Sequence, residues 1–201
     1  FRDNLPNNLL HELNAGASSN MQSSGSGQEW ALRSFFGRAN YNISDRYLFE
    51  ANARYDGTSR FPSKGRWGLF PSVSAGWRIS EEGFFKDNVR NIDNLKLRVS
   101  WGRLGNQNIG NYPYQNVLNL GYGYPVGDVL SPGARLVNLA NQDITWETTT
   151  ITDIGLDMTL AGGKLDLVMD YFDKHTTDIL YNLTVSSVLG LTPSEVNAAS
   201  V

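Results

Sequence analysis

The sequence predicts an all-β fold, in which antiparallel strands form one segment of a transmembrane β-barrel. The first observation is a two-residue alternation of apolar and polar residues that repeats in six segments. The second is their length, because each apolar stretch spans about 9–11 residues, enough for a tilted strand to cross a bilayer. The third is that short and long connections alternate along the chain, as they do in outer-membrane barrels.

The stretch from Leu69 to Ser80 shows the alternation most clearly. Its odd positions are mostly apolar and include Val73 and Ala75, whereas its even positions include Ser74 and Arg78. Successive side chains of a strand point to opposite faces, so one face of this strand meets an apolar environment and the other a wet one. The alternation alone leaves open whether the apolar face covers a soluble core or faces lipid.

The same pattern predicts six strands in order along the chain. Aromatic residues stand near the ends of their apolar faces, where the interfacial girdles of a membrane barrel lie. These aromatic residues are Tyr41, Tyr47, Tyr55, Trp77, Trp101 and Tyr171. The predicted strands cover residues 31–43, 46–56, 67–80, 94–104, 146–160 and 163–181.

The connections between these strands are sorted by length. The short ones are a tight turn at residues 42–46 and a two-residue Gly-Gly hairpin within Ala161–Lys164, and the link at 81–93, with one helical turn at 84–89, is of moderate length. The longer ones are residues 56–66, the very long loop 105–145 and the segment after Asp173. Because barrels have short periplasmic turns and long extracellular loops, the long connections are expected outside the cell.

The chain divides into three parts. Residues 1–30 are rich in Ser, Gly and Asn and are expected to form an extracellular loop. Residues 31–181 are expected to hold the barrel strands with the long loop 105–145, and residues 182–201 a truncated extracellular loop. Six strands cannot close a membrane barrel, so the chain is expected to be either a piece of a larger barrel or not a membrane protein at all.

Composition excludes several classes of function. A net charge of −3 over 201 residues does not favour nucleic-acid binding. The absence of cysteine excludes disulfides and thiolate chemistry. No run of 18 apolar residues predicts a transmembrane helix. His11 and His175 lack metal-ligand spacing, and Asp166, Asp170, Asp173 and Asp178 lack the calcium-loop pattern. We therefore predict no enzyme, no cofactor and no metal site.

Two groups of residues are candidates for substrate contact. The tyrosines of the long loop have rings that suit stacking on sugars, although packing around Pro113 and Pro125 explains them equally well. These tyrosines are Tyr112, Tyr114, Tyr122 and Tyr124. Arg54, Arg78 and Arg98 on the wet face could line a substrate path. In the competing interpretation these arginines, and Arg38 with them, form ion pairs with carboxylates such as Glu50 and Asp56.

A series of short motifs resembles the SusC/RagA family of TonB-dependent outer-membrane transporters. The motifs follow one another from about residue 32 to 181 in the order found in that family. They are residues 32–41 (LRSFFGRANY), 45–48 (DRYL), 54–61 (RYDGTSRF), 66–78 (RWGLFPSVSAGWR), 94–102 (NLKLRVSWG), 105–107 (GNQ), 146–147 (WE), 155–157 (GLD), 171–174 (YFDK) and 177–178 (TD).

The resemblance implies a 22-stranded plugged barrel in the outer membrane of a Gram-negative, Bacteroidetes-type cell. It implies import of oligosaccharide or peptide nutrients together with a SusD-like surface lipoprotein. It also implies contact with outer-membrane lipid, and with the TonB complex through an N-terminal part that this chain lacks. Two alternatives stay open at this point: a siderophore or vitamin receptor, and a soluble glycan-binding β-sandwich with the tyrosine-rich loop as its site.

Overall fold

A computed structural model describes residues 27–89 and 91–201. The loop predicted at residues 1–30 lies almost entirely outside the described residues, as does His11. The chain divides into two units, residues 1–31 and 32–201, and the strands belong to the second unit.

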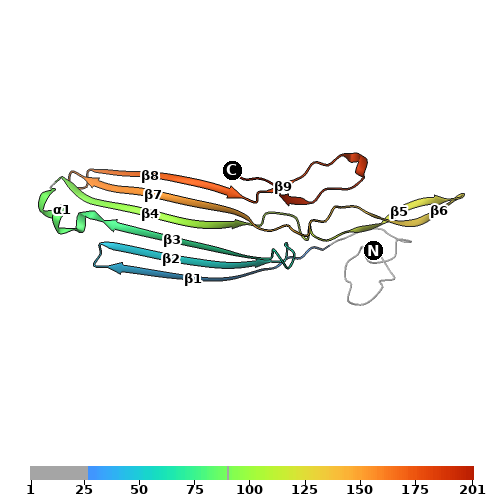
Figure 1. Cartoon of the computed structure of the whole chain (residues 1–201), viewed down its shortest axis with the longest axis horizontal. Helices are drawn as coiled ribbons and strands as arrows, with labels where there is room; N and C mark the ends of the chain where they lie inside the picture. The colour runs from blue at the N-terminus through green and yellow to red at the C-terminus, as the bar shows by residue number, and fades with distance from the viewer. Residues whose placement is uncertain (1–26, 90) are drawn as a thin grey trace. The chain divides into compact units, whose positions relative to one another are not determined.

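The second unit is built on one antiparallel sheet of six strands (Figure 1). Consecutive strands of the chain lie side by side, in the order β1-β2-β3-β4-β7-β8. The strands are β1 Leu32–Ile43, β2 Tyr47–Thr58, β3 Trp67–Arg78, β4 Ile92–Asn106, β7 Glu147–Leu160 and β8 Leu165–Thr177. The six strands predicted from the alternation are confirmed, with most ends within one or two residues of the predicted ones.

The register aligns the apolar positions of all six strands on one face of the sheet. One row of paired residues reads Tyr41, Phe49, Ala75, Val99, Ile154 and Tyr171. The next row reads Asn40, Glu50, Ser74, Ser100, Asp153 and Phe172. Because side chains alternate across a strand, the first row lies on one face and the second on the other. The sheet therefore has an apolar face and a mainly polar face.

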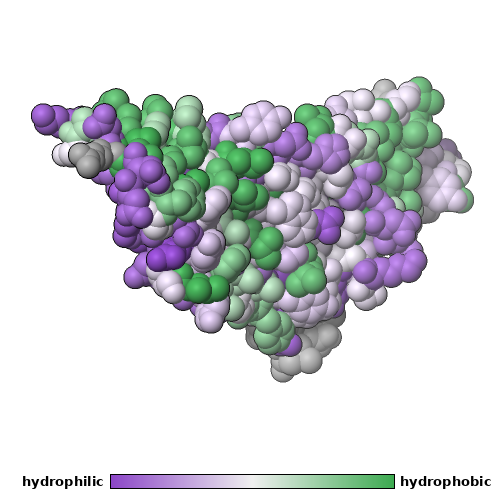
Figure 2. All heavy atoms as spheres, turned by 60° about the vertical axis from the view of Figure 1, so that its left-hand side comes forward, coloured by the Kyte–Doolittle hydropathy of each residue, from purple (hydrophilic) through white to green (hydrophobic). Residues whose placement is uncertain are grey.

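The apolar face is uncovered within the described part of the chain. Val73 is 50% exposed and Tyr171 is 75% exposed. The remaining strands form only two-stranded pairs, β5 Leu118–Val126 with β6 Val129–Leu136 and β9 Leu180–Asn182 with β10 Glu195–Asn197. On the face shown in Figure 2, hydrophobic residues are exposed among hydrophilic ones. A soluble sandwich would bury this face under a second sheet, which these residues do not supply.

Aromatic side chains cluster at both ends of the apolar face. At one end Trp67 stacks on Tyr55, with ring centroids 4.8 Å apart, and on Phe35 at 6.2 Å. At the other end Tyr47 stacks on Trp77 at 6.5 Å. Tyr47 and Tyr55 are eight residues apart on β2, or about 26 Å along the strand. This spacing resembles the apolar band of about 25 Å between the aromatic girdles of membrane barrels.

One end of the sheet carries the two tightest connections, β1–β2 and β7–β8, and the longer β3–β4 link. Residues 44–46 join β1 to β2, with Ser44 and Asp45 in the left-handed region (φ 51° and 55°). The link from β3 to β4 contains a 3-10 turn, η2 Ile79–Glu81, and the helix α1 Gly83–Asn88, which confirms the predicted helical turn (Figure 1).

The turn between β7 and β8 corrects a prediction. Leu160 pairs with Leu165, so Ala161–Lys164 is a four-residue connection rather than a two-residue hairpin. Ala161, Gly162 and Gly163 all have positive φ, and the amides of both glycines donate to Asp93 Oδ2, at 2.7 and 3.1 Å. The Asp93 carboxylate thus stabilises a turn that is longer than the glycine pair alone predicts.

The connections at the other end are more ordered than predicted. The stretch 105–145, expected to lack structure, contains the β5–β6 hairpin, and β4 extends one residue further than Gly105. In the segment 182–201, β10 pairs with β9, and Val201 and Thr176 exchange backbone hydrogen bonds. A further 3-10 turn, η3 Ser187–Leu189, lies between β9 and β10.

Candidate functional site

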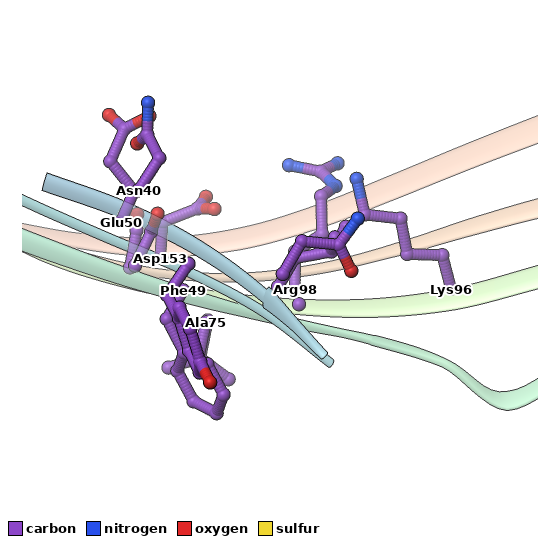
Figure 3. Close-up of a pocket in the computed structure, with 14 residues that line it drawn as sticks. Asn40, Phe49, Glu50, Ala75, Lys96, Arg98 and Asp153 are labelled. Carbon is purple, nitrogen blue, oxygen red and sulfur yellow. The ribbon is translucent and has the colours of Figure 1, made fainter. Parts of the chain in front are cut away.

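The polar face of the six-stranded sheet is one candidate surface for substrate. A hollow of about 450 Å³ lies against it. Figure 3 shows that Asn40, Glu50 and Asp153 point to one side of the sheet, and Phe49 and Ala75 to the other. The polar side also carries Lys96 and Arg98. Carboxylates, ammonium groups, amides and hydroxyls are thus mixed, which suits hydrogen bonding to a neutral polar ligand more than capture of one charge.

Arg98 is held by two carboxylates on this face. Its Nε and one terminal nitrogen donate to the two oxygens of Asp157, both at 2.9 Å, and the same terminal nitrogen donates to Asp170 at 2.9 Å. Gly155 leaves room for this arrangement, because a Cβ there would lie 2.7 Å from Arg98 Cζ. The positive charge of Arg98 is therefore paired with carboxylates on β7 and β8.

The other predicted arginines also pair with carboxylates. Arg54 Nε lies 2.7 Å from Asp56 Oδ2, and Arg78 lies 3.4 Å from Glu81 Oε1. These contacts favour the structural interpretation of the arginines. Whether any of them also contacts substrate stays a prediction.

The structure does not bring the four tyrosines of the long loop together. Tyr112 and Tyr114 form an edge-to-face pair at 6.1 Å, and the Tyr114 hydroxyl donates to the Ser59 carbonyl at 3.4 Å. Tyr122 and Tyr124 lie instead on β5. Arg135 covers the Tyr122 ring at 4.1 Å, while Tyr124 is 64% exposed.

A small apolar core stands at the end of the sheet that carries the long connections. Its buried members are Phe61, Ile109, Ile144 and Trp146, with Phe70, Tyr114 and Leu180 packed against them. Trp146 meets Phe61 edge-on at 5.3 Å, and its indole N–H donates to the Arg66 carbonyl at 3.1 Å. This core joins the β2–β3 loop to the long loop and gives both a fixed shape.

A polar pocket of about 440 Å³ lies between the same two loops; we call it the rim pocket. It is lined by Pro62, Ser63, Lys64, Arg66, Tyr114, Gln142 and Asp143. Of these residues only Tyr114 was a candidate from the sequence. The others come from two loops about 80 residues apart that carry no periodic pattern, so only the folded chain brings them together.

Neither a metal site nor a membrane-spanning helix is found in the described part of the chain. Residues 27–89 and 91–201 contain no group of three or more His, Asp or Glu side chains placed to hold a metal ion. No helix among them has the length and apolarity needed to cross a membrane.

Glu82 links the aromatic residues at the short-turn end of the sheet. Its carboxylate accepts hydrogen bonds from the Tyr47 hydroxyl at 2.8 Å and the Trp77 indole N–H at 3.1 Å. Arg46 lies 3.3 Å from the other carboxylate oxygen. The hydrogen bond from Tyr47, and to a smaller extent the one from Trp77, lowers the pKa of Glu82 below its ordinary value.

The chain is similar in sequence to a known family of proteins. Residues 1–200 match the family described as "TonB dependent receptor-like, beta-barrel". TonB-dependent receptor SusC of Bacteroides thetaiotaomicron is 41% identical over 158 residues, which are 77% of this chain and 16% of that protein. TonB-dependent receptor P39 of Formosa agariphila is 36% identical over 171 residues, or 85% of this chain and 16% of that protein.

Solved structures show the same fold. The RagAB peptide importer in its "closed-closed" state superposes with a TM-score of 0.75 at 26% identity, covering 96% of this chain and 21% of the solved one. A second structure, of the RagAB peptide transporter, gives a TM-score of 0.73 at 26% identity, with 94% and 20% covered. The chain thus spans about a sixth of the length of the curated relatives it matches.

Proposed function

Because this chain belongs to the family of TonB-dependent receptor β-barrels, we propose that it forms part of the wall of an outer-membrane nutrient importer. Members of this family are transporters rather than enzymes. The wall segment contributes six strands and the connections between them, and no covalent chemistry.

The observation that carries this proposal is the in-register apolar face with an aromatic cluster at each end. Such a face is stable against lipid and unstable in water. The opposite face, with Glu50, Lys96 and Asp153, then faces the wet interior of the barrel. The long connections, including residues 105–145, lie outside the cell, together with residues 1–30 and 182–201.

The imported nutrient is an oligosaccharide or a peptide. The resemblance to the SusC/RagA family supports this class, and the matched solved structures are described as a peptide importer and transporter. The mixture of charges and hydroxyls on the polar face suits ligands with many hydrogen-bonding groups. Energy for import comes from the TonB complex, through a part of the protein outside this chain.

The partner is a SusD-like surface lipoprotein that caps the extracellular side. The β5–β6 hairpin supports this proposal, because it presents large apolar side chains to the surroundings. Leu120 is 74% exposed and Leu130 is 72% exposed. Exposed apolar patches on an extracellular loop are typical of protein interaction sites.

Uptake in the native cell tests the proposed import. Deletion of the full-length gene should abolish uptake of a labelled oligosaccharide or peptide pool, and reintroduction of the gene should restore it. A strain that lacks TonB activity serves as a matched control and should also fail to import. Undiminished uptake in the deletion strain would contradict the proposal.

Co-purification tests the partner. The lipoprotein should elute with the full-length receptor from detergent extracts. A receptor with residues 118–136 replaced by a short Gly-Ser linker should lose it while still reaching the outer membrane. Retention of the lipoprotein by this variant would assign the contact to another loop.

A further inference from the structure

We propose that the rim pocket binds a carboxylate group of the imported substrate; this inference rests on the proposed import function. The pocket lies between residues 62–66 and residues 142–143, at the end of the sheet that carries the long connections. A substrate therefore meets it before reaching the polar face of the sheet.

The charges of the rim pocket favour a single anionic group. Lys64 and Arg66 supply two positive charges and Asp143 supplies one negative charge, so the lining carries a net charge of +1. Within the described residues, neither cation forms a salt bridge or a side-chain hydrogen bond. Arg66 Nε is buried and has no hydrogen-bond partner among these residues. This contrasts with Arg54, Arg78 and Arg98, whose charges are all paired.

The walls of the rim pocket are fixed before any ligand arrives. The Gly65 amide donates to the Pro62 carbonyl at 3.1 Å, and Thr145 Oγ1 donates to the Gly65 carbonyl at 3.3 Å. A Cβ at Gly65 would lie 2.8 Å from the Ile144 carbonyl oxygen, so the two loops pack as closely as their backbones permit. Preformed walls lower the entropic cost of binding.

Tyr114 adds an apolar surface beside the two cations. Its hydroxyl is tied to the Ser59 carbonyl, which fixes the ring as part of the lining. An aromatic ring next to a positive charge suits a carboxylate attached to a sugar ring or to a short peptide. Asp143 and Gln142 remain for the hydroxyls or amides of the same ligand. The volume of about 440 Å³ falls within the range of small-molecule sites.

Binding to the full-length receptor in detergent, measured by calorimetry at low salt, tests this site. The probes form two matched pairs: a trisaccharide ending in glucuronic acid with its glucose counterpart, and a tripeptide with a free C-terminal carboxylate with its amide. In at least one pair the acidic probe should bind about tenfold more tightly or better, as expected for hydrogen bonds to a charged group. The pair that responds identifies a uronate or a peptide terminus as the source of the carboxylate.

Variants separate the rim pocket from the rest of the protein. Arg66→Gln and Lys64→Gln should remove the preference for the acidic probe, whereas Asp143→Asn should keep or strengthen it. Lys174→Gln, a cation on β8, is the matched control and should leave the preference unchanged. Heat-dependent mobility in gels confirms that each variant forms a folded barrel.

Two results would overturn the rim pocket as a carboxylate site: equal binding of both members of each pair by the unmodified receptor, or an unchanged preference in the Arg66→Gln variant. Either result leaves import itself intact, because uptake is measured separately. Failure of the proposed import function would instead show as undiminished uptake in the deletion strain.

Discussion

Neighbouring residues on β3 meet opposite environments, although they follow one another in the chain. Ala75 lies in the apolar row with Phe49 and Val99, whereas Ser74 lies in the polar row with Glu50 and Asp153. We predict that Ala75→Arg destabilises the full-length barrel by about 1–2 kcal/mol, because it places a charge on the lipid-facing side between the bilayer midplane and the interface marked by Trp77, and that Ser74→Arg costs much less. Unfolding in urea from lipid vesicles measures both. Equal effects of the two changes would contradict the assignment of the faces.

Gly155 illustrates how a missing side chain supports a charge cluster. A Cβ at this position would collide with Arg98 and Asp170. We predict that Gly155→Ala displaces the guanidinium and lowers the free energy of unfolding of the full-length barrel by about 1–3 kcal/mol. Gly37 is the matched control, since a Cβ there meets nothing within 4 Å. If Gly37→Ala proves as destabilising as Gly155→Ala, the cluster is not the cause.

Glu82 gives the short-turn end of the sheet a dependence on pH. Hydrogen bonds from Tyr47 and Trp77 lower the pKa of this carboxyl in the folded protein. A lowered pKa means that the carboxylate stabilises the fold above its ordinary pKa and that this stability is lost as the pH falls through the lowered value. We predict that Glu82→Gln lowers the melting temperature of the full-length receptor at pH 7, and that the difference from the unmodified protein shrinks as the pH falls through the lowered pKa of Glu82. A difference in melting temperature that grows as the pH falls would contradict this role of Glu82.

At the scale of whole elements, strand positions follow from the sequence and loop structure does not. The alternation predicted all six sheet strands because each strand has one apolar and one polar face. The β5–β6 hairpin was missed, although Leu118, Leu120, Tyr122, Tyr124 and Val126 also alternate. Its intervening positions hold glycines and a proline, which are typical of loops, and they concealed the period.

The candidate site could be predicted only in part for the same reason. The polar positions of a strand are set by its period, so the location of Arg54 and Arg98 on the wet face was accessible from the sequence. Their partners were not, except for Asp56, because Asp157 and Asp170 approach Arg98 only through the pairing of different strands. The rim pocket depends on two loops that meet across a small apolar core, for which no local pattern exists.

The order of short and long connections predicts which side of the membrane each element faces. Protease added to intact cells should cut within residues 105–145 and after Asp173, and should spare Ala161–Lys164. The reason is that antiparallel strands place alternate connections at opposite ends of the sheet, and the long ones are proposed to lie outside. Permeabilised cells are the control in which the glycine turn becomes accessible. Cleavage at Gly162 in intact cells would reverse the topology.

Among the residues that the structure describes, the six-stranded sheet leaves backbone hydrogen-bonding groups of its outer strands unpaired and its apolar face uncovered. β1 and β8 are its outer strands, and a strand edge in lipid leaves N–H and C=O groups without partners. Among residues 27–89 and 91–201, only a short stretch of β8 is paired beyond the sheet, through Thr176 and Val201. The apolar face adds an uncovered surface with Val73, Val99 and Ile154 at its centre. The buried core in the described residues is confined to the small cluster at the loop end.

These features predict that residues 31–181, expressed alone without detergent, aggregate or stay unfolded. Soluble monomers rarely expose apolar patches larger than a few hundred Å², and the apolar face of six strands greatly exceeds that. The four buried apolar side chains, Phe61, Ile109, Ile144 and Trp146, are too few to offset this exposure in water. Size-exclusion chromatography and circular dichroism with heating measure the outcome, and the full-length receptor refolded in detergent is the control. A monodisperse monomer of residues 31–181 with a cooperative thermal transition would contradict the barrel wall, because such a domain must bury its apolar face by itself.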